Sequence, residues 1–551
     1  MAIDEQATLD LKTPSLARSR PLERAGSGFT VRDFALASLA LLVLGVVTYL
    51  PARHGGFYLD DWSNAAGALY PPGGESAFSY FREFTIYRPV LVLYLPLQFF
   101  VFGTHMALQL AWSAFLAALA SALLYGVLRK LGVPRLHAWL PAALALIYPW
   151  FDSTRLWVTG SILTLSICFT FAGLWLALEG LDRRSWRLHA CAATLYLASI
   201  WTYEVTMPLI ALAGALYTVR AGWRAARMRW GVDLVVVVVG GLWIATQTTQ
   251  ESEDFSTDLK HVGEIIVSGG TIIGRSLIPL GAVRTTVALV LILVVLLAGS
   301  AVLAFRRLPA PRGASWSLRG WLLLAGGGLM LAVLGWIMFI PANPYFTPSV
   351  YGITNRVNAL SGFGAVILLY GSFGVAGELL ARVVPRVTRI ALPATILLAL
   401  ILGGVYTHVF ERHVRVWNAA FRAEMAGLGE TKTQFPQLPP GTTVFTSDYP
   451  AYQALGVPIF SASWDVNGMI KLQYKDSELA AYPVLEGQRL ICKETVVWLA
   501  GAGAPTAIAK YGMARFLNVH TGEHAEPRNR KQCEAVAGKY SPGPLYVSLE
   551  Y

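Results

Sequence analysis

Two neighbouring carboxylates, Asp60 and Asp61, follow the first long apolar stretch of the chain, within Gly55-Gly56-Phe57-Tyr58-Leu59-Asp60-Asp61-Trp62. Carboxylates close to lipid are costly unless they bind something or take part in chemistry. An aspartate here can act as a general base that takes a proton from a hydroxyl group, and a like charge beside it raises one of the two pKa values. The alternative is structural: the pair caps an interfacial helix in a solvated loop.

The composition shows what kind of molecule holds this pair. Of the 551 residues, 55% are hydrophobic and 14% are charged, whereas soluble globular proteins carry about 25% charged residues. An ordinary cytoplasmic enzyme and a disordered chain are therefore excluded. The four cysteines exclude a disulfide-dense scaffold. The sequence predicts an integral membrane protein that is mainly α-helical.

Apolar runs set the expected number of membrane spans, since a helix needs about 20 apolar residues to cross the hydrocarbon core. We expect eleven spans, at 34–52, 106–128, 137–151, 158–179, 189–203, 204–219, 231–248, 285–305, 320–340, 357–380 and 390–409. Residues 189–219 hold either two short spans or one long kinked element. The apolar run 89–103 is short and contains Pro96, so we expect it to be re-entrant or interfacial.

The placement of basic residues gives the expected orientation, because Lys and Arg stay on the cytoplasmic side. With the N-terminus inside, every expected inner loop is basic and the outer segments before residue 410 carry few basic side chains. Membrane topology then accounts for the net charge of +11, so this charge does not indicate a nucleic-acid partner. We expect a cytoplasmic tail over 1–33, an uncleaved first span, and a membrane domain over 34–409 whose first outer loop covers 53–105. The Ala-, Leu-, Val-, Gly- and Arg-rich composition favours a bacterial source, for which we expect the inner membrane.

The segment 410–551 has mixed polarity, frequent Pro and Gly, and strand-like pieces at 442–446 and 495–499. It suits one small α/β domain, which the eleven spans place on the periplasmic side. There Cys492 and Cys533 either form a disulfide or remain two buried free thiols. The aromatic residues of this segment are expected to pack in its core more often than to stack on sugar rings; they include Tyr449, Tyr452, Trp464 and Tyr474.

The acidic pair after the first span, the outer loop with interfacial helices, and Tyr87-Arg88-Pro89 together resemble the GT-C superfamily of membrane glycosyltransferases, which use polyprenyl-phosphate sugars. The resemblance covers roughly the first 220 residues. Tyr148-Pro149-Trp150-Phe151-Asp152 and Trp157-Val158-Thr159-Gly160 look like the third-span loop of the protein O-mannosyltransferase-like branch. Arabinofuranosyltransferases of this superfamily also carry an acidic pair near the first span and an outer C-terminal domain. Tyr203-Glu204 departs from the Lys-Glu pair that related proteins often carry at this place.

The resemblance implies that the acid of the first outer loop is the catalytic base, which maps onto Asp60 or Asp61. Asp60 is favoured by analogy, and its neighbour would orient the acceptor or the base; the sequence itself does not separate the two. The residues implied to contact substrate are Trp62, Tyr87, Asp152, Glu204 and Asn355.

A lipid-phosphate donor needs a cation beside the phosphate that leaves. The candidates are Arg88, whose backbone is biased to an extended conformation by Pro89, and Arg356, within Thr354-Asn355-Arg356-Val357-Asn358. Arginine suits this role through its permanent charge and bidentate fork. The alternative for each arginine is a side chain that snorkels to lipid headgroups.

The sequence therefore predicts an inverting glycosyltransferase that moves one sugar from a polyprenyl-phosphate donor to a glycan, glycolipid or protein acceptor on the outer face of the membrane. Mannose, glucose and arabinofuranose are equally compatible. No HExxH or CxxC pattern is present, so we expect no metal and no cofactor, although an acidic pair can hold a divalent ion. Three alternatives remain. A lipid-linked glycan transporter would have paired charges mid-span and an internal repeat, and an oligosaccharide ligase or polymerase would have an outer loop rich in Arg and His. The third is a binding protein that has lost activity.

Overall fold

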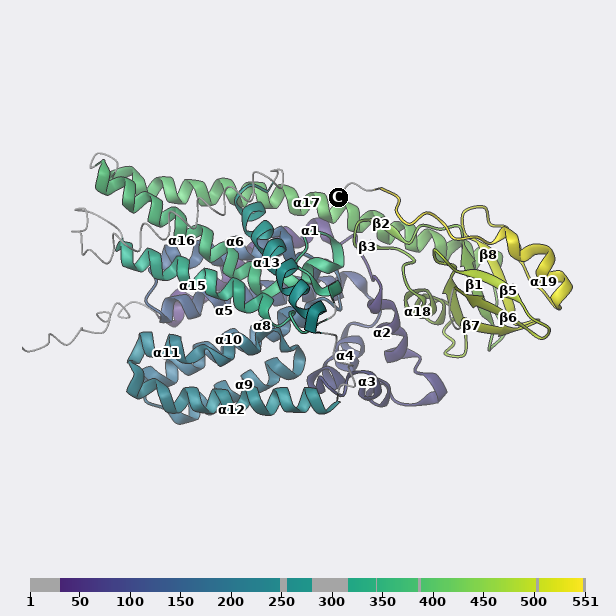
Figure 1. Cartoon of the computed structure of the whole chain (residues 1–551), viewed down its shortest axis with the longest axis horizontal. Coiled ribbons are helices and arrows are strands. Elements are labelled where there is room, and N and C mark those ends of the chain that lie inside the picture. The colour runs from purple at the N-terminus through teal and green to yellow at the C-terminus, as the bar shows by residue number, and fades with distance from the viewer. Residues whose placement is uncertain are drawn as a thin grey trace, which may run out of the picture.

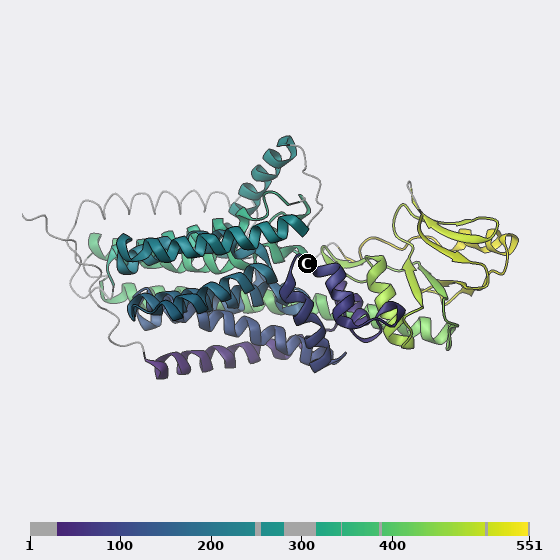
Figure 2. The ribbon, with the colours of Figure 1, turned by 90° about the horizontal axis from the view of Figure 1, so that it is seen from below.

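The computed structural model describes residues 30–247, 255–279, 316–342, 344–384, 388–501 and 505–548. In these residues the chain forms a long bundle of helices, and a smaller region that contains the strands lies at one end of it (Figure 1). A second view, turned by 90°, shows the same end-to-end arrangement, with the helices that follow the first long helix lying between the two parts (Figure 2).

Long apolar helices make up the bundle. They are α1 (Val31–Ala52), α5 (Met106–Lys130), α6 (Arg135–Ile147), α8 (Ser161–Asp182), α9 (Trp186–Thr202), α10 (Met207–Ala211), α11 (Ala213–Ala221), α12 (Trp223–Gln247), α13 (Phe255–Leu277), α15 (Leu318–Ile337), α16 (Ala359–Val383) and α17 (Thr388–Gln434). Within the described residues, seven helical segments are long and apolar enough to cross a membrane. The fold therefore fits a polytopic membrane protein.

The expected count of eleven spans is not confirmed. The expected span 285–305 lies outside the described residues, and α6 and α9 have only 13 and 17 residues. The stretch 189–219 is not one kinked element: α9 ends at Thr202, and α10 and α11 follow after a short 3₁₀ turn. Arg220 at the end of α11 pairs with Asp182, which lies just before α9, with 3.0 Å between the nitrogen and the oxygen. The chain thus reverses direction after α9.

Three helices fill the loop between α1 and α5. They are α2 (Asp60–Leu69), α3 (Ala77–Thr85) and α4 (Pro89–Phe102), with a 3₁₀ turn at Pro72–Gly74. The 14 residues of α4 are too few to cross the hydrocarbon core, as expected for 89–103. Its exposed apolar side chains include Leu93, Leu97 and Phe100.

Helix α17 continues through the expected domain boundary at residue 410. It has 47 residues, and its second half carries Val414, Trp417 and Ala420 on a buried face. The change from helix to strand comes instead between Gln434, the last residue of α17, and Thr443. Helix α17 therefore connects the bundle to the region that contains the strands, and one hydrophobic cluster includes residues of both.

That C-terminal region holds the strands β1 (Thr443–Ser447), β2 (Tyr452–Ala454), β3 (Val457–Pro458), β4 (Ala480–Pro483), β5 (Arg489–Cys492), β6 (Val496–Ala500), β7 (Pro505–Lys510), β8 (Ala514–Asn518) and β9 (His524–Ala525), with the helices α18 (Ser463–Tyr474) and α19 (Arg530–Val536). One sheet has the order β4-β1-β8-β9, with β1 parallel to both of its neighbours, and a second has the antiparallel order β5-β6-β7. The strands expected at 442–446 and 495–499 correspond to β1 and β6, each shifted by one residue.

A disulfide joins the second sheet to the last helix. Cys492 at the end of β5 is bonded to Cys533 of α19, with 5.9 Å between their Cα atoms. Of the two alternatives expected from the sequence, the paired cysteines are the one observed.

Candidate functional site

Asp61 is held by four hydrogen bonds and has no exposed surface. Its Oδ1 accepts from the backbone N–H and the hydroxyl of Thr159, both at 2.6 Å. Its Oδ2 accepts from the backbone N–H groups of Tyr58 and Val158, both at 3.1 Å. Burial raises the pKa of Asp61 to about 7, against the lowering effect of these donors. Asp61 therefore fastens the loop after α1 to the segment before α8.

Asp60 lies one residue away in a different environment. It is partly exposed, and its Oδ1 accepts a hydrogen bond from the indole N–H of Trp464 at 2.8 Å. Burial raises the pKa of Asp60, while the Trp464 hydrogen bond and the positive charge of Arg356 oppose that rise. The preceding residue, Leu59, has φ 48° and ψ −114°, a strained conformation for a residue with a side chain. The structure thus separates the two acids: one is enclosed by donors and the other is accessible.

Arg356 lies on the 3₁₀ segment Gly352–Asn358 and is partly exposed. Its guanidinium carbon lies 5.1 Å from the ring centre of Trp157, 5.4 Å from Phe346 and 5.7 Å from Tyr345. Among the described residues Arg356 makes no ion pair; its one hydrogen bond goes to the carbonyl of Ile353 at 3.4 Å. Aromatic faces hold a cation without neutralising it. Since its charge acts on Asp60, the expected base and an expected phosphate ligand lie in the same neighbourhood.

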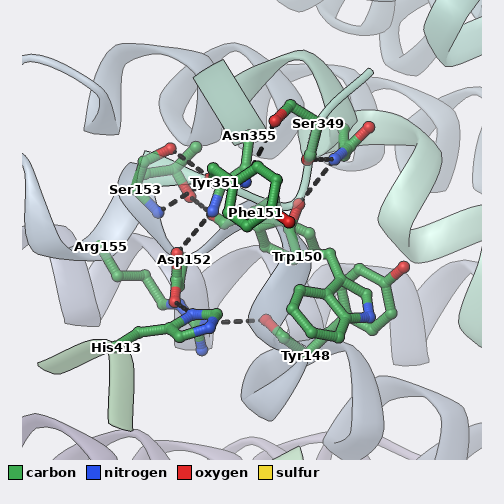
Figure 3. A network of polar contacts seen from close by, with 12 residues as sticks. Tyr148, Trp150, Phe151, Asp152, Ser153, Arg155, Ser349, Tyr351, Asn355 and His413 are labelled. Atoms are coloured by element: carbon green, nitrogen blue, oxygen red, sulfur yellow. Dashed lines mark hydrogen bonds and ion pairs between the residues drawn. The ribbon is translucent and has the colours of Figure 1, made fainter. Parts of the chain in front are cut away.

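A buried polar network orders the segment that carries Arg356 (Figure 3). The Asn355 amide donates to Asp152 Oδ1 at 2.7 Å, and Asn355 Oδ1 accepts from the Ser153 hydroxyl at 2.6 Å. Asp152 Oδ2 is hydrogen-bonded to His413 of α17. Asp152 and Asn355 were expected to contact substrate, but neither has any exposed surface. They bond to each other, and this contact anchors the 3₁₀ segment on which Asn355 directly precedes Arg356. Their contact with substrate stays a prediction.

Arg88 forms an ion pair with a carboxylate of the protein itself. Its Nε and Nη2 donate to the two oxygens of Glu204, at 3.0 and 2.7 Å, and its guanidinium carbon lies 3.9 Å above the ring centre of Tyr203 and 5.0 Å from that of Tyr87. Burial works to lower the pKa of Arg88 but the charge of Glu204 raises it above its ordinary value. The structure brings Tyr87, Arg88 and Glu204 together as one group. In the part of the chain that is described, no hydrogen bond or ion pair joins this group to Asp60 or Arg356.

Trp62 packs against protein, and its expected contact with substrate stays a prediction. It is buried, and its indole N–H donates to Glu424 Oε2 of α17 at 3.3 Å. The other oxygen of Glu424 is buried and has no partner among the described residues. Trp464 was expected to pack in the core of the C-terminal region, but it is 50% exposed. Its contact with Asp60, and the roles of Glu424 and His413, were not predicted, because each of the three contacts a residue more than 250 positions away.

Two glycines allow the C-terminal region to pack closely against the site. A Cβ on Gly468 of α18 would overlap the backbone of Trp62, so α18 packs directly against α2. Gly352 has φ 44°, and a Cβ there would overlap the carbonyl of Gly456, which accepts a hydrogen bond from the backbone N–H of Ile353 at 2.8 Å. The turn between β2 and β3 therefore fixes the start of the segment that bears Arg356.

Gly352→Ala is expected to lower the melting temperature of the protein more than Gly441→Ala does. Gly441 also has positive φ, 76°, but a Cβ there meets nothing within 4 Å, so this control isolates the backbone strain, which is about 1 to 2 kcal/mol. Gly352→Ala adds the displacement of Gly456. Thermal unfolding of both variants in the same detergent measures the difference. Equal shifts would show that the contact between Gly352 and Gly456 does not contribute to stability.

No metal site is apparent: within the described ranges, no group of three or more His, Cys, Asp or Glu side chains is placed to hold a metal ion. The expectation that the protein needs no metal stays a prediction. No protein-family model matches the chain, and none of the curated proteins is significantly similar to it.

Proposed function

We propose that this protein is an inverting glycosyltransferase that moves a monosaccharide from a polyprenyl-phosphate donor to a hydroxyl group of a glycan, glycolipid or protein. The observation that carries the proposal is the partly exposed Asp60 carboxylate within the electrostatic reach of Arg356, an arginine that forms no ion pair within the described residues. A base and an unneutralised cation at one end of an apolar bundle are the groups that this transfer requires. The orientation that we propose places this end on the periplasmic side of a bacterial inner membrane.

In the proposed reaction, Asp60 takes the proton of the acceptor hydroxyl, and the acceptor oxygen attacks the anomeric carbon of the donor sugar. The bond between that carbon and the phosphate oxygen breaks, and its electron pair leaves with the polyprenyl phosphate. Arg356 stabilises the charge that this phosphate gains. Direct displacement inverts the anomeric carbon. Asp61, with all of its contacts made to backbone and Thr159, holds the loop in place while its neighbour reacts.

A lipid-linked glycan transporter is the second candidate, and one observation favours it. His189 of α9 and Asp233 of α12 are fully buried in the bundle, with 3.2 Å between His189 Nε2 and Asp233 Oδ1. The hydroxyl of Tyr217 donates to the other Asp233 oxygen at 2.7 Å. Ionisable groups buried among membrane helices mark transport pathways in many transporters. This cluster lies on other helices than the group around Asp60, so the two functions can be tested separately.

The deciding experiment is incubation of the purified protein with polyprenyl-phosphate mannose, glucose and arabinofuranose. For a glycosyltransferase we expect free polyprenyl phosphate to appear from one donor, and only when a glycan acceptor is added. The same donors, fluorescently labelled in one leaflet of a vesicle, measure transport. Movement of the label across the bilayer without any consumption of donor would contradict the glycosyltransferase function and support the transporter function.

A further inference from the structure

We infer that Trp464 of the C-terminal region binds a sugar ring of the acceptor and places its hydroxyl beside Asp60. This inference deepens the proposed function, on which it rests, by assigning acceptor recognition to a residue outside the bundle. The occupant is a glycan, because the exposed face of an indole whose N–H already donates to Asp60 suits the apolar face of a sugar ring, whose hydroxyl groups then lie beside the carboxylate.

The position of Trp464 supports this role. It is the second residue of α18, and its side chain is 50% exposed although its indole N–H contacts Asp60. The following residues of α18, Asp465, Val466, Met469 and Ile470, are buried. An indole that is anchored through its N–H and half exposed can accept a ring on its exposed face without repacking the helix.

The first turn of α18, which carries Trp464, is held in place by contacts on both sides. Asp465 Oδ2 accepts from the backbone N–H of Ala462 at 3.1 Å and closes the first turn of the helix. Gly468 brings α18 into backbone contact with α2, the helix that begins with Asp60. The distance between Trp464 and Asp60 is therefore fixed by packing between two helices and does not depend on a loop.

The groups that face Asp60 also predict a pH signature. They are the indole of Trp464, the guanidinium of Arg356 on its own 3₁₀ segment, and the carboxyl group of Asp465, besides the neighbouring Asp61. A hydrogen bond to a carboxylate favours its charged form and lowers its pKa. Replacing the indole by a phenyl ring removes this bond, so the pKa of Asp60 rises and the acid limb of the pH profile moves to higher pH.

Binding is measured with the full-length protein in nanodiscs and with fluorescein-labelled mannotriose, glucotriose and arabinofuranotriose, by fluorescence anisotropy. We expect the wild-type protein to bind one of them, Trp464→Ala to weaken that binding roughly tenfold, and Trp464→Phe to retain most of it. Trp464→Leu fills more of the space than alanine without an aromatic face, and we expect it to behave like Trp464→Ala. The matched control is Trp223→Phe, at a tryptophan that is 52% exposed on another helix, which we expect to change nothing.

The outcomes separate this inference from the proposed function. Equal binding by the wild-type protein, Trp464→Ala and Trp464→Leu, or no binding of any of the three glycans by the wild-type protein, would overturn it. If no donor supports transfer but glycan binding still depends on Trp464, the inferred glycan site is supported and the proposed transferase function is contradicted. If transfer occurs, Trp464→Phe must also move the acid limb upward; an unmoved limb would show that the contact with Asp60 has no role in the reaction.

Discussion

Asp60→Asn is expected to slow sugar transfer by about 10²–10⁴-fold, the range that a general base contributes, while the protein stays folded. Asparagine keeps the shape of the side chain and an oxygen that can accept from the indole of Trp464, but it cannot take the proton of the acceptor hydroxyl. The release of polyprenyl phosphate, with donor and acceptor both saturating, measures the rate. A melting temperature near that of the wild-type protein shows that the loss is chemical.

The neighbouring acid provides the control. Asp61 accepts from four donors, so Asp61→Asn points an amide NH₂ at N–H groups and leaves at least one donor without a partner in a buried place. Such a loss is worth about 1 to 3 kcal/mol. We expect Asp61→Asn to lower the melting temperature, whereas Asp60→Asn should not. If Asp60→Asn kept its activity and Asp61→Asn lost it without unfolding, the roles that we propose for the two acids would have to be exchanged.

The pH profile adds an independent check on Asp60. Because burial raises its pKa above the ordinary value for aspartate, a higher pH is needed before the group is ionised and able to act as a base. The acid limb of the rate should therefore lie above pH 3.8. An acid limb that is unchanged in a variant without this carboxylate would assign the titration to another group.

The helices were predictable from the sequence because apolar runs are local features, and ten of the eleven expected spans overlap a described helix. The length of α17 was not recognised, since the polar residues after 410 read as the start of a separate domain. A signal was nevertheless present: Phe410, Val414 and Trp417 follow one another at intervals of four and three residues, which is helical spacing. A change to polar residues does not by itself mark the end of a helix that extends beyond the bundle.

The site was predictable only in part, for the same physical reason. The acidic pair was recognised from its place after α1, yet the difference between Asp60 and Asp61 depends on Thr159 and on Trp464, which lies 404 positions away. Glu204 and Arg88 were each singled out, but the ion pair between them is a long-range contact that no local spacing predicts. Residue type shows what chemistry is possible, and the partners that tertiary packing supplies determine which residue is left to do it.

Arg356→Ala is expected to reduce transfer by about 10²–10³-fold, comparable to the loss of one donor that stabilises developing charge. The positive charge of Arg356 rests among aromatic rings, so its removal leaves no buried carboxylate without a partner and the melting temperature should change little. Arg356→Lys keeps the charge but lacks the fork that holds two phosphate oxygens, and we expect it to restore activity only in part. Initial rates with saturating donor measure the loss of catalysis, and a titration of donor shows whether binding is also weakened.

Arg88→Ala is the comparison that separates a phosphate ligand from a structural arginine. Arg88 pairs through two hydrogen bonds with Glu204, so its removal leaves a largely enclosed carboxylate unpaired, which destabilises the fold. We therefore expect Arg88→Ala to lower the melting temperature, and Arg88→Ala combined with Glu204→Gln to recover part of it because the unpaired charge is gone. Arg356 has no such partner to neutralise in the described structure, and no second substitution of this kind should rescue its loss. If Arg356→Ala transferred sugar at the wild-type rate while the stabilised double variant at Arg88 and Glu204 did not, the phosphate would have to bind at Arg88, and the ion pair seen here would have to open to admit it.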